Sequence, residues 1–340
     1  MNWQARLKAL RASLTCDGLL IENPIDLFYL TGVSVSRGRL LVTHAGATLF
    51  VDGRYLSAAK ERCPCPVAPE QEWKAATIAC GSTIGFDSTF VTCDNFQKLL
   101  TLLPNIQWLP VIAPVQFLRV CKDAEEISAL KEAAELTRAG IAHMRSLLKE
   151  GVTEEQLAWE FEVFCRTRGA SGLSFDSIVA FGKNGAFPHY RAGSARLQKG
   201  DVVLMDVGAI VKDYHGDLTQ IAFFGEVPPA LQRMDRLVRQ AQEEAIAHVR
   251  PGVRAGELDK MVHNFFAKEG VDHLFTHGLG HGVGIETHEF PRLRWDGADK
   301  DALLTPGMVI TIEPGLYQPG VGGIRHEAMI HVTKTGYERI

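Results

Sequence analysis

Residues 204–220, LMDVGAIVKDYHGDLTQ, decide the fold of the carboxy-terminal part of the chain. They begin inside the run 201–211, DVVLMDVGAIV, which is apolar and rich in β-branched side chains and therefore predicts a buried strand. Asp206 lies in the middle of that run. A single buried acid is more often a satisfied structural group, but an isolated carboxylate in a strand is costly unless it is paired or binds a metal. Asp206 is therefore a candidate ligand.

The second half of the same stretch supplies another acid. Asp217 follows the turn-forming residues 212–216, KDYHG, and precedes 218–224, LTQIAFF, which predicts the return strand of an antiparallel pair. Such a hairpin would bring Asp206 and Asp217 to one end of a sheet.

The same arrangement occurs again near the end of the chain. The runs 307–317, GMVITIEPGLY, and 323–333, GIRHEAMIHVT, each predict a strand that carries an acid, Glu313 in the first and Glu327 in the second. Glycine and proline are frequent in the segment between them, so a second hairpin is expected.

A fifth candidate, His281, lies in the glycine-rich segment 278–284, where missing side chains would let the backbone approach the site closely. A lone histidine in such a segment is usually an ordinary loop residue. Four carboxylates and one imidazole together, however, suit two hard divalent cations that share bridging oxygens. Two such ions would lower the pKa of the water between them and polarise a scissile carbonyl, which predicts a hydrolase that needs no serine or cysteine nucleophile.

Length and composition limit the possible functions. At 340 residues the chain is long enough for two domains with separate cores, and 46% hydrophobic and 22% charged residues are ordinary globular values. The net charge of −4 gives no broad attraction to nucleic acid or to an anionic membrane, so neither is expected as a partner. Charged residues at Arg6, Lys8 and Arg11 interrupt the first segment, and no run of about 18 apolar residues occurs, so neither a secretory signal nor a membrane span is expected.

The cysteines indicate the redox environment. Their number, seven, is odd, and Cys63 and Cys65 have the wrong spacing for a CxxC redox or zinc pair. Reduced thiols and a cytoplasmic location are therefore expected.

The first part of the chain is expected to form an α/β domain. Residues 3–13 and 53–63 have helical spacing, and the runs 18–22, 38–44 and 47–53 predict strands. The character of the sequence changes near residue 120, where a long amphipathic helix is predicted over 122–151 and a second helix over 153–168.

The four motif stretches, taken in order, resemble the dimetal peptidases of the "pita-bread" family, M24, whose members include aminopeptidase P, prolidase and methionine aminopeptidase. The stretches are residues 204–220, THGLGHGVGIETHEFP at 276–291, ITIEPGLY at 310–317 and GGIRHEAMI at 322–330. Two earlier phrases, ENPIDLFYLTG from Glu22 and LFVDGRY from Leu49, resemble the amino-terminal domain shared by creatinase, aminopeptidase P and prolidase. The resemblance implies an α/β (α+β) fold with a creatinase-like, ribonuclease H-like domain at 1–118. It also implies a pita-bread catalytic domain at 119–340, with an antiparallel sheet flanked by helices.

The resemblance also implies roles for the five ligands. By the family pattern, Asp206 binds one ion, His281 and Glu313 bind the other, and Asp217 and Glu327 bridge both. Glu313 is expected to be the general base as well, because it would contact a metal ion and the attacking water together. Manganese is the expected metal, with cobalt and zinc as alternatives.

Further residues match substrate-contacting positions of the aminopeptidase P and prolidase branches. They are His189 in FPHYRAG, His277 in HGLGHG and His288 in ETHEFP. An uncharged imidazole there could donate a hydrogen bond to the substrate carbonyl and stabilise the oxyanion, whereas each histidine alone would be interpreted as a surface residue. Arg325, two residues before Glu327, would pair with a ligand carboxylate, receive the carboxyl end of the substrate or face solvent.

Three positions depart from the family pattern. Gln220 stands where many relatives have arginine, Ala328 where a second acid is common, and His326 where an aliphatic residue is usual. These residues are expected to surround the ligands, so the departures bear on metal affinity and rate more than on metal binding itself.

Two features of the chain, its amino-terminal domain and its full set of metal ligands, favour the proline-specific branch of the family. Methionine aminopeptidases usually lack that domain, and creatinases lack the full ligand set. We therefore expect a metal-dependent aminopeptidase that hydrolyses the bond between an N-terminal residue and proline (Xaa-Pro) in small peptides. A prolidase restricted to Xaa-Pro dipeptides is the alternative, and a peptide-binding module without catalysis is the alternative of another class. The resemblance further implies a homodimer or larger oligomer in which the amino-terminal domain borders the neighbouring subunit's active-site mouth.

Overall fold

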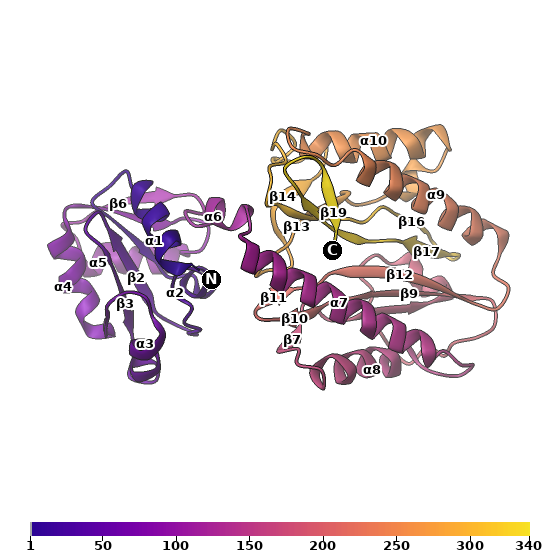
Figure 1. Ribbon diagram of the computed structural model, residues 1–340, viewed down its shortest axis with the longest axis horizontal. Helices are drawn as coiled ribbons and strands as arrows, with labels where there is room; N and C mark the ends of the chain where they lie inside the picture. Colours follow the sequence, from indigo (N-terminus) through magenta and orange to yellow (C-terminus); the bar gives the residue numbers. More distant parts are fainter. Residues whose placement is uncertain (1) are drawn as a thin grey trace. The chain divides into compact units, whose positions relative to one another are not determined.

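The computed structural model describes residues 2–340, which form two compact units, one up to Arg119 and the other Val120–Ile340 (Figure 1). The first unit is built on one six-stranded sheet with the order β4-β3-β2-β1-β5-β6. Its strands are β1 (Gly18–Ile21), β2 (Arg39–Thr43), β3 (Ala47–Val51), β4 (Val67–Pro69), β5 (Thr83–Asp87) and β6 (Gln107–Val111). Its helices are α1 (Trp3–Ala12), α2 (Pro24–Thr31), α3 (Leu56–Arg62), α4 (Trp73–Cys80), α5 (Cys93–Leu102) and α6 (Gln116–Val120).

The first unit follows the predicted pattern of elements. The two predicted helices are present as α1 and α3, and the three predicted strands as β1, β2 and β3. β1 is buried at all of its positions because it pairs with β2 on one side and β5 on the other, antiparallel and parallel respectively. Leu20 of β1 belongs to an apolar cluster that also contains Trp73 and Trp108, so this unit has a core of its own.

The second unit repeats one order of elements, in which two helices precede a set of paired strands. The first set comprises α7 (Ala124–Ser146), α8 (Glu154–Arg166), β7 (Gly172–Leu173), β8 (Ile178–Phe181), β9 (Asp201–Val207), β10 (Ala209–Val211), β11 (Tyr214–His215) and β12 (Leu218–Phe224). The second comprises α9 (Pro229–Ala247), α10 (Ala255–Lys268), β13 (Gly280–Gly282), β14 (Glu289–Leu293), β15 (Val309–Ile312), β16 (Gly315–Gln318), β17 (Gly322–Arg325), β18 (Ala328–Val332) and β19 (Tyr337–Arg339). Figure 1 shows the four long helices flanking the strands of this unit.

Capping residues define where the first two helices of this unit begin. Asp123 caps α7 in a reciprocal capping box with Glu126, and Thr153 caps α8 in the same way with Gln156. The predicted end of α7 at residue 151 is wrong, since the helix ends at Ser146. The amides of the next two residues bond to carbonyls three residues back, which tightens the last turn and closes the helix early.

The hairpin predicted around residues 201–224 forms, but each of its strands changes sheet halfway. β9 pairs with β12 in one sheet, and β10 pairs with β11 in another. The break occurs at Gly208, where a Cβ atom would lie 2.1 Å from the carbonyl oxygen of Gly216. Because only glycine permits this close approach, the predicted single strand over 201–211 is divided in two. Asp206 consequently lies near the end of β9 rather than in the middle of a long strand.

The second hairpin behaves in the same way. β15 pairs with β18, while β16 pairs with β17 in a separate two-stranded sheet. Glu313 lies in the break between β15 and β16, and Glu327 lies in the break between β17 and β18. Pro314 has no amide hydrogen to donate, which favours a break at this position. Each predicted long strand is therefore two short strands with the acid between them.

Candidate metal centre and active site

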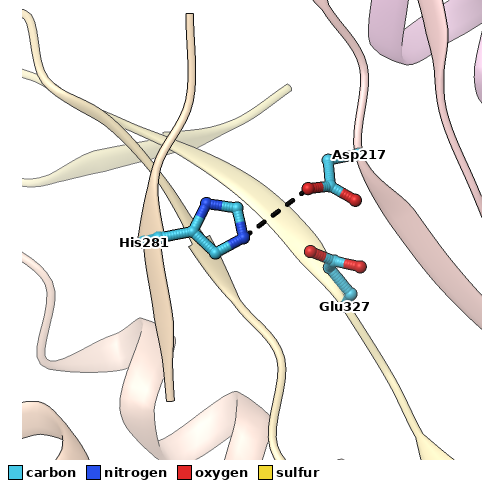
Figure 2. A group of neighbouring side chains, drawn as sticks. All are labelled: Asp217, His281 and Glu327. Atoms are coloured by element: carbon cyan, nitrogen blue, oxygen red, sulfur yellow. Dashed lines mark ion pairs between the residues drawn. The ribbon is translucent and has the colours of Figure 1, made fainter. Parts of the chain in front are cut away.

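The five predicted ligands come from the places where the two hairpins change sheet and from the strand beside them. Asp217 directly precedes β12, and His281 lies in the middle of β13, a short strand rather than the predicted loop. Ligand atoms of Asp217, His281 and Glu327 lie within 4.8 Å of one another, and Figure 2 shows the three side chains converging. His281 Nε2 lies 3.4 Å from Glu313 Oε1 and 3.6 Å from Asp217 Oδ2. Asp206 lines the same pocket as these four residues.

The imidazole of His281 is arranged to offer one nitrogen lone pair to the carboxylates. Its Nδ1–H donates to the carbonyl of Gly282 at 2.9 Å, which leaves Nε2 facing the acids. Burial, reinforced by His288, lowers the pKa of His281 to about 3, so the ring is neutral at ordinary pH. Neutral imidazole with a fixed tautomer is the form in which histidine binds metals.

The carboxylates are crowded in a way that fits divalent cations. Burial and then repulsion from neighbouring acids raise the pKa values of Asp217 and Glu327 well above their ordinary range. Burial also raises the pKa of Glu313 to about 8. Asp206 Oδ1 is buried and has no hydrogen-bond partner among residues 2–340. Since cations would neutralise this crowding and bind the orphaned oxygen, the donor set fits hard divalent metals.

Arg325 is buried, with 3% of its surface exposed, so it does not face solvent. It forms an ion pair with Asp206 Oδ2 and donates to the hydroxyls of Tyr317 at 2.6 Å and Thr219 at 3.1 Å. Thr219 in turn donates to Glu327 Oε2 at 2.8 Å. Of the alternatives raised by the sequence, the structure shows Arg325 paired with the carboxylate of a predicted ligand, Asp206. Through Thr219 the same guanidinium is also linked to Glu327, a second predicted ligand.

The three predicted substrate histidines differ in their surroundings. His189 and His288 are exposed and line the pocket. Burial lowers the pKa of His277 to about 4, and its Nδ1–H donates to the carbonyl of Gly278 at 2.8 Å. Nε2 of this neutral ring accepts from the Tyr317 hydroxyl at 2.8 Å. With both nitrogens engaged, His277 has no N–H left for a substrate, and it supports Tyr317 and through it Arg325.

The sequence analysis missed several residues that shape this site. Tyr317 and Thr219 stand inside the quoted motifs, but their contacts with Arg325 depend on strand geometry that no spacing reveals. Glu154, in the first turn of α8, is another such residue. It is fully buried and accepts hydrogen bonds from Tyr190 at 2.8 Å and Asn184 at 2.9 Å, and thereby anchors the segment that carries His189. Nothing in the sequence distinguishes such a buried acid from an exposed one.

The pocket that contains the site has a volume of about 710 Å³. The five predicted ligands form one part of its lining, and apolar side chains of Phe175 and Ile178 form another. A pocket of this size, with a few converging polar groups, suits a small organic ligand.

The chain is similar to known proteins in both sequence and structure. Two family models match the chain: Metallopeptidase family M24 over residues 128–334, and the Creatinase/Prolidase N-terminal domain over residues 4–121. A relative from Pyrococcus horikoshii, named Xaa-Pro dipeptidase, is 33% identical over 331 residues, which cover 95% of this chain and 92% of the relative.

Solved structures are similar over nearly the whole chain. An Xaa-Pro dipeptidase from Bacillus anthracis has a TM-score of 0.96 at 31% identity, covering 99% of this chain and 97% of that one. An X-Pro aminopeptidase from Thermotoga maritima has a TM-score of 0.89 at 28% identity, covering 97% of each chain.

The expected fold class, a creatinase-like amino-terminal domain followed by a pita-bread domain, is confirmed by these matches. Within residues 2–340, no helix is both long enough and apolar enough to span a bilayer. The chain therefore belongs to Metallopeptidase family M24 and carries the creatinase/prolidase type of amino-terminal domain.

Proposed function

We propose that the protein is a metal-dependent Xaa-Pro aminopeptidase, which releases the N-terminal residue from small peptides that have proline at the second position. The observation that carries this proposal is the cluster of three carboxylates, Asp217, Glu313 and Glu327, around Nε2 of a neutral imidazole, in a pocket that Asp206 also lines and whose volume of about 710 Å³ suits the end of a peptide. The names of its relatives, Xaa-Pro dipeptidase and X-Pro aminopeptidase, support the choice of proline.

The proposed ligand roles follow the family pattern. Asp206 would hold one divalent ion, His281 and Glu313 would hold a second, and Asp217 and Glu327 would serve both. We propose manganese, with cobalt and zinc as alternatives, because oxygen-rich sites without cysteine suit harder ions. When bound, the two ions would acidify a water molecule and polarise the substrate carbonyl.

The side chains of the chain itself supply the remaining chemistry. Glu313 accepts the proton of the attacking water and delivers it to the departing proline nitrogen. His189 and His288 line the pocket and donate hydrogen bonds to the developing oxyanion. Arg325 holds Asp206 in place, and His277 orients the Tyr317 hydroxyl that contacts Arg325.

The second candidate is a dipeptidase restricted to Xaa-Pro dipeptides, and the names of two close relatives favour it. A series of peptides with the same first two residues, from a dipeptide to a pentapeptide, separates the candidates. An aminopeptidase retains its kcat/KM as the peptide lengthens, whereas a dipeptidase loses it at the first added residue. Matched peptides with alanine in place of proline serve as the control, and equal turnover of both would contradict proline specificity.

We propose a cytoplasmic protein that acts on peptides as a homodimer or larger oligomer, with neither nucleic acid nor membrane as partner. All seven cysteines are free thiols, which suits a reducing compartment. A peptide-binding module without catalysis is the competing class, and it would bind Xaa-Pro peptides without hydrolysing them when manganese is saturating.

A further inference from the structure

Gln242 of α9 holds the backbone on both sides of the second hairpin at the place where the hairpin changes sheet. Its side-chain amide nitrogen donates to the carbonyl of Ile312 at 3.0 Å and to the carbonyl of His326 at 2.8 Å. These residues immediately precede the two ligand glutamates, Glu313 and Glu327. The side chain of Gln242 is buried, with 8% of its surface exposed, so it lies behind the strands.

The two carbonyls need this partner because the regular pairing of strands is interrupted around them. The ladder of β15 and β18 ends at Ile312 and Ala328, and the ladder of β16 and β17 begins again at Gly315 and Arg325. Buried carbonyl groups in such a gap require a donor from elsewhere. Gln242 supplies both donors from a single amide group.

The amides of the two glutamates are held from the opposite side by strands that carry the other ligands. Glu313 N donates to the carbonyl of Leu279 at 2.8 Å, two residues before His281. Glu327 N donates to the carbonyl of Thr219 at 3.1 Å, and Thr219 lies two residues after Asp217. Each glutamate is therefore fixed between a ligand-bearing strand and helix α9.

A second contact between α9 and the same break involves His326. Its Nε2 lies 2.6 Å from Asp235 Oδ1, and Asp235 precedes Gln242 by seven residues, or two helical turns, on the same face of α9. His326 is one of the positions at which the sequence departs from the family pattern. His326, the residue before Glu327, is thus held to α9 twice, by its imidazole through Asp235 and by its carbonyl through Gln242.

We infer that Gln242, assisted by the Asp235–His326 pair, is a positioning device that sets the spacing of Glu313 and Glu327 and thereby the affinity for metal. The inference rests on the proposed metal-dependent function. Gln242 is not among the described residues that line the pocket, and its amide donates to backbone carbonyls, so it acts through the backbone that it holds. Residues that orient metal ligands in this indirect way typically change metal affinity by about 10- to 100-fold when they are replaced.

The test is the dissociation constant for Mn²⁺, measured by titration calorimetry on the full chain after chelation, well below its unfolding temperature. Gln242→Met preserves length and volume but removes both donors, and it should weaken binding by about 10-fold or more. Saturating Mn²⁺ should restore most of its turnover, which a general disruption of the fold would prevent. Gln240→Met is the matched control, because Gln240 is exposed on the same helix and its side-chain amide donates to the neighbouring Glu244 at 2.9 Å rather than to the hairpin.

His326→Leu removes only the side-chain tether and should weaken binding less than Gln242→Met does. It also keeps the inference testable if Gln242→Met fails to fold, because unchanged Mn²⁺ affinity in His326→Leu would then overturn it. A folded Gln242→Met variant with the affinity of the unmodified chain would overturn the inference while leaving the proposed function intact. Failure of the unmodified chain itself to bind Mn²⁺, Co²⁺ or Zn²⁺ would overturn both.

Discussion

Glu313 is the residue on which the proposed chemistry depends most. It lies after β15, its Oε1 faces His281 Nε2, and burial raises its pKa. Glu313→Gln keeps the shape but removes both a base and a negative ligand, so we expect kcat to fall by roughly 100-fold or more while the fold is retained. Steady-state kinetics with metal analysis of the same sample check this. Near-normal turnover with intact metal content would show that another group is the base.

Asp259 of α10 provides a separate prediction about pH. It is fully buried and accepts a hydrogen bond from the amide of Trp295, and its Oδ1 lies 3.9 Å from His263 Nε2. Burial raises the pKa of Asp259 to about 6, against the lowering effect of that hydrogen bond and of the nearby His263 and Arg294. The folded state therefore binds more protons than the unfolded state between about pH 4 and pH 6.

Over this window Asp259 makes the free energy of unfolding fall as the pH rises. Asp259→Asn retains an oxygen acceptor without a charge, and it should remove this contribution, so that its stability relative to the unmodified chain increases from pH 4 to pH 7. Denaturant unfolding of both proteins across that range measures the difference. A difference that stays constant with pH would show that Asp259 does not titrate there.

At the scale of the elements, the sequence predicted which hairpins form but not where they break. Alternation and β-branched content identify strands in runs such as 201–211 and 307–317, and turn residues identify the hairpins. The breaks depend on close approaches between distant backbones, as at Gly208, and on hydrogen bonds from another element, as from Gln242. A one-dimensional pattern contains neither, which is why the acids that the sequence singled out were expected inside long strands rather than next to the breaks.

The break at Gly208 leads to a prediction about stability. In Gly208→Ala the new Cβ would lie 2.1 Å from the carbonyl oxygen of Gly216, so the crossing of the two strands must open. We expect a loss of about 2 kcal/mol or more in the free energy of unfolding. Gly172→Ala is the control, because its nearest atom outside neighbouring residues is 3.6 Å away. Equal stability of the two variants by denaturant unfolding would contradict the proposed origin of the break.

At the scale of the whole molecule, the amino-terminal unit contributes none of the proposed ligands. We propose that it serves assembly and restricts the site to narrow peptide ends, as the family resemblance implies. Deleting residues 1–118 should expose apolar surface and impair oligomerisation, and the full chain should be a dimer or larger by light scattering at micromolar concentration. A monomeric full chain, together with undiminished Xaa-Pro hydrolysis by residues 119–340 alone, would exclude this role.

The central claim is that a two-ion centre built from Asp206, Asp217, His281, Glu313 and Glu327 hydrolyses Xaa-Pro bonds. Exhaustive chelation followed by stepwise return of Mn²⁺, with bound metal and hydrolysis of a Xaa-Pro peptide measured on the same samples, tests it most directly. We predict no hydrolysis without metal and full activity at about two ions per chain. Full activity after chelation, or saturation at fewer than about one ion per chain, would contradict the account.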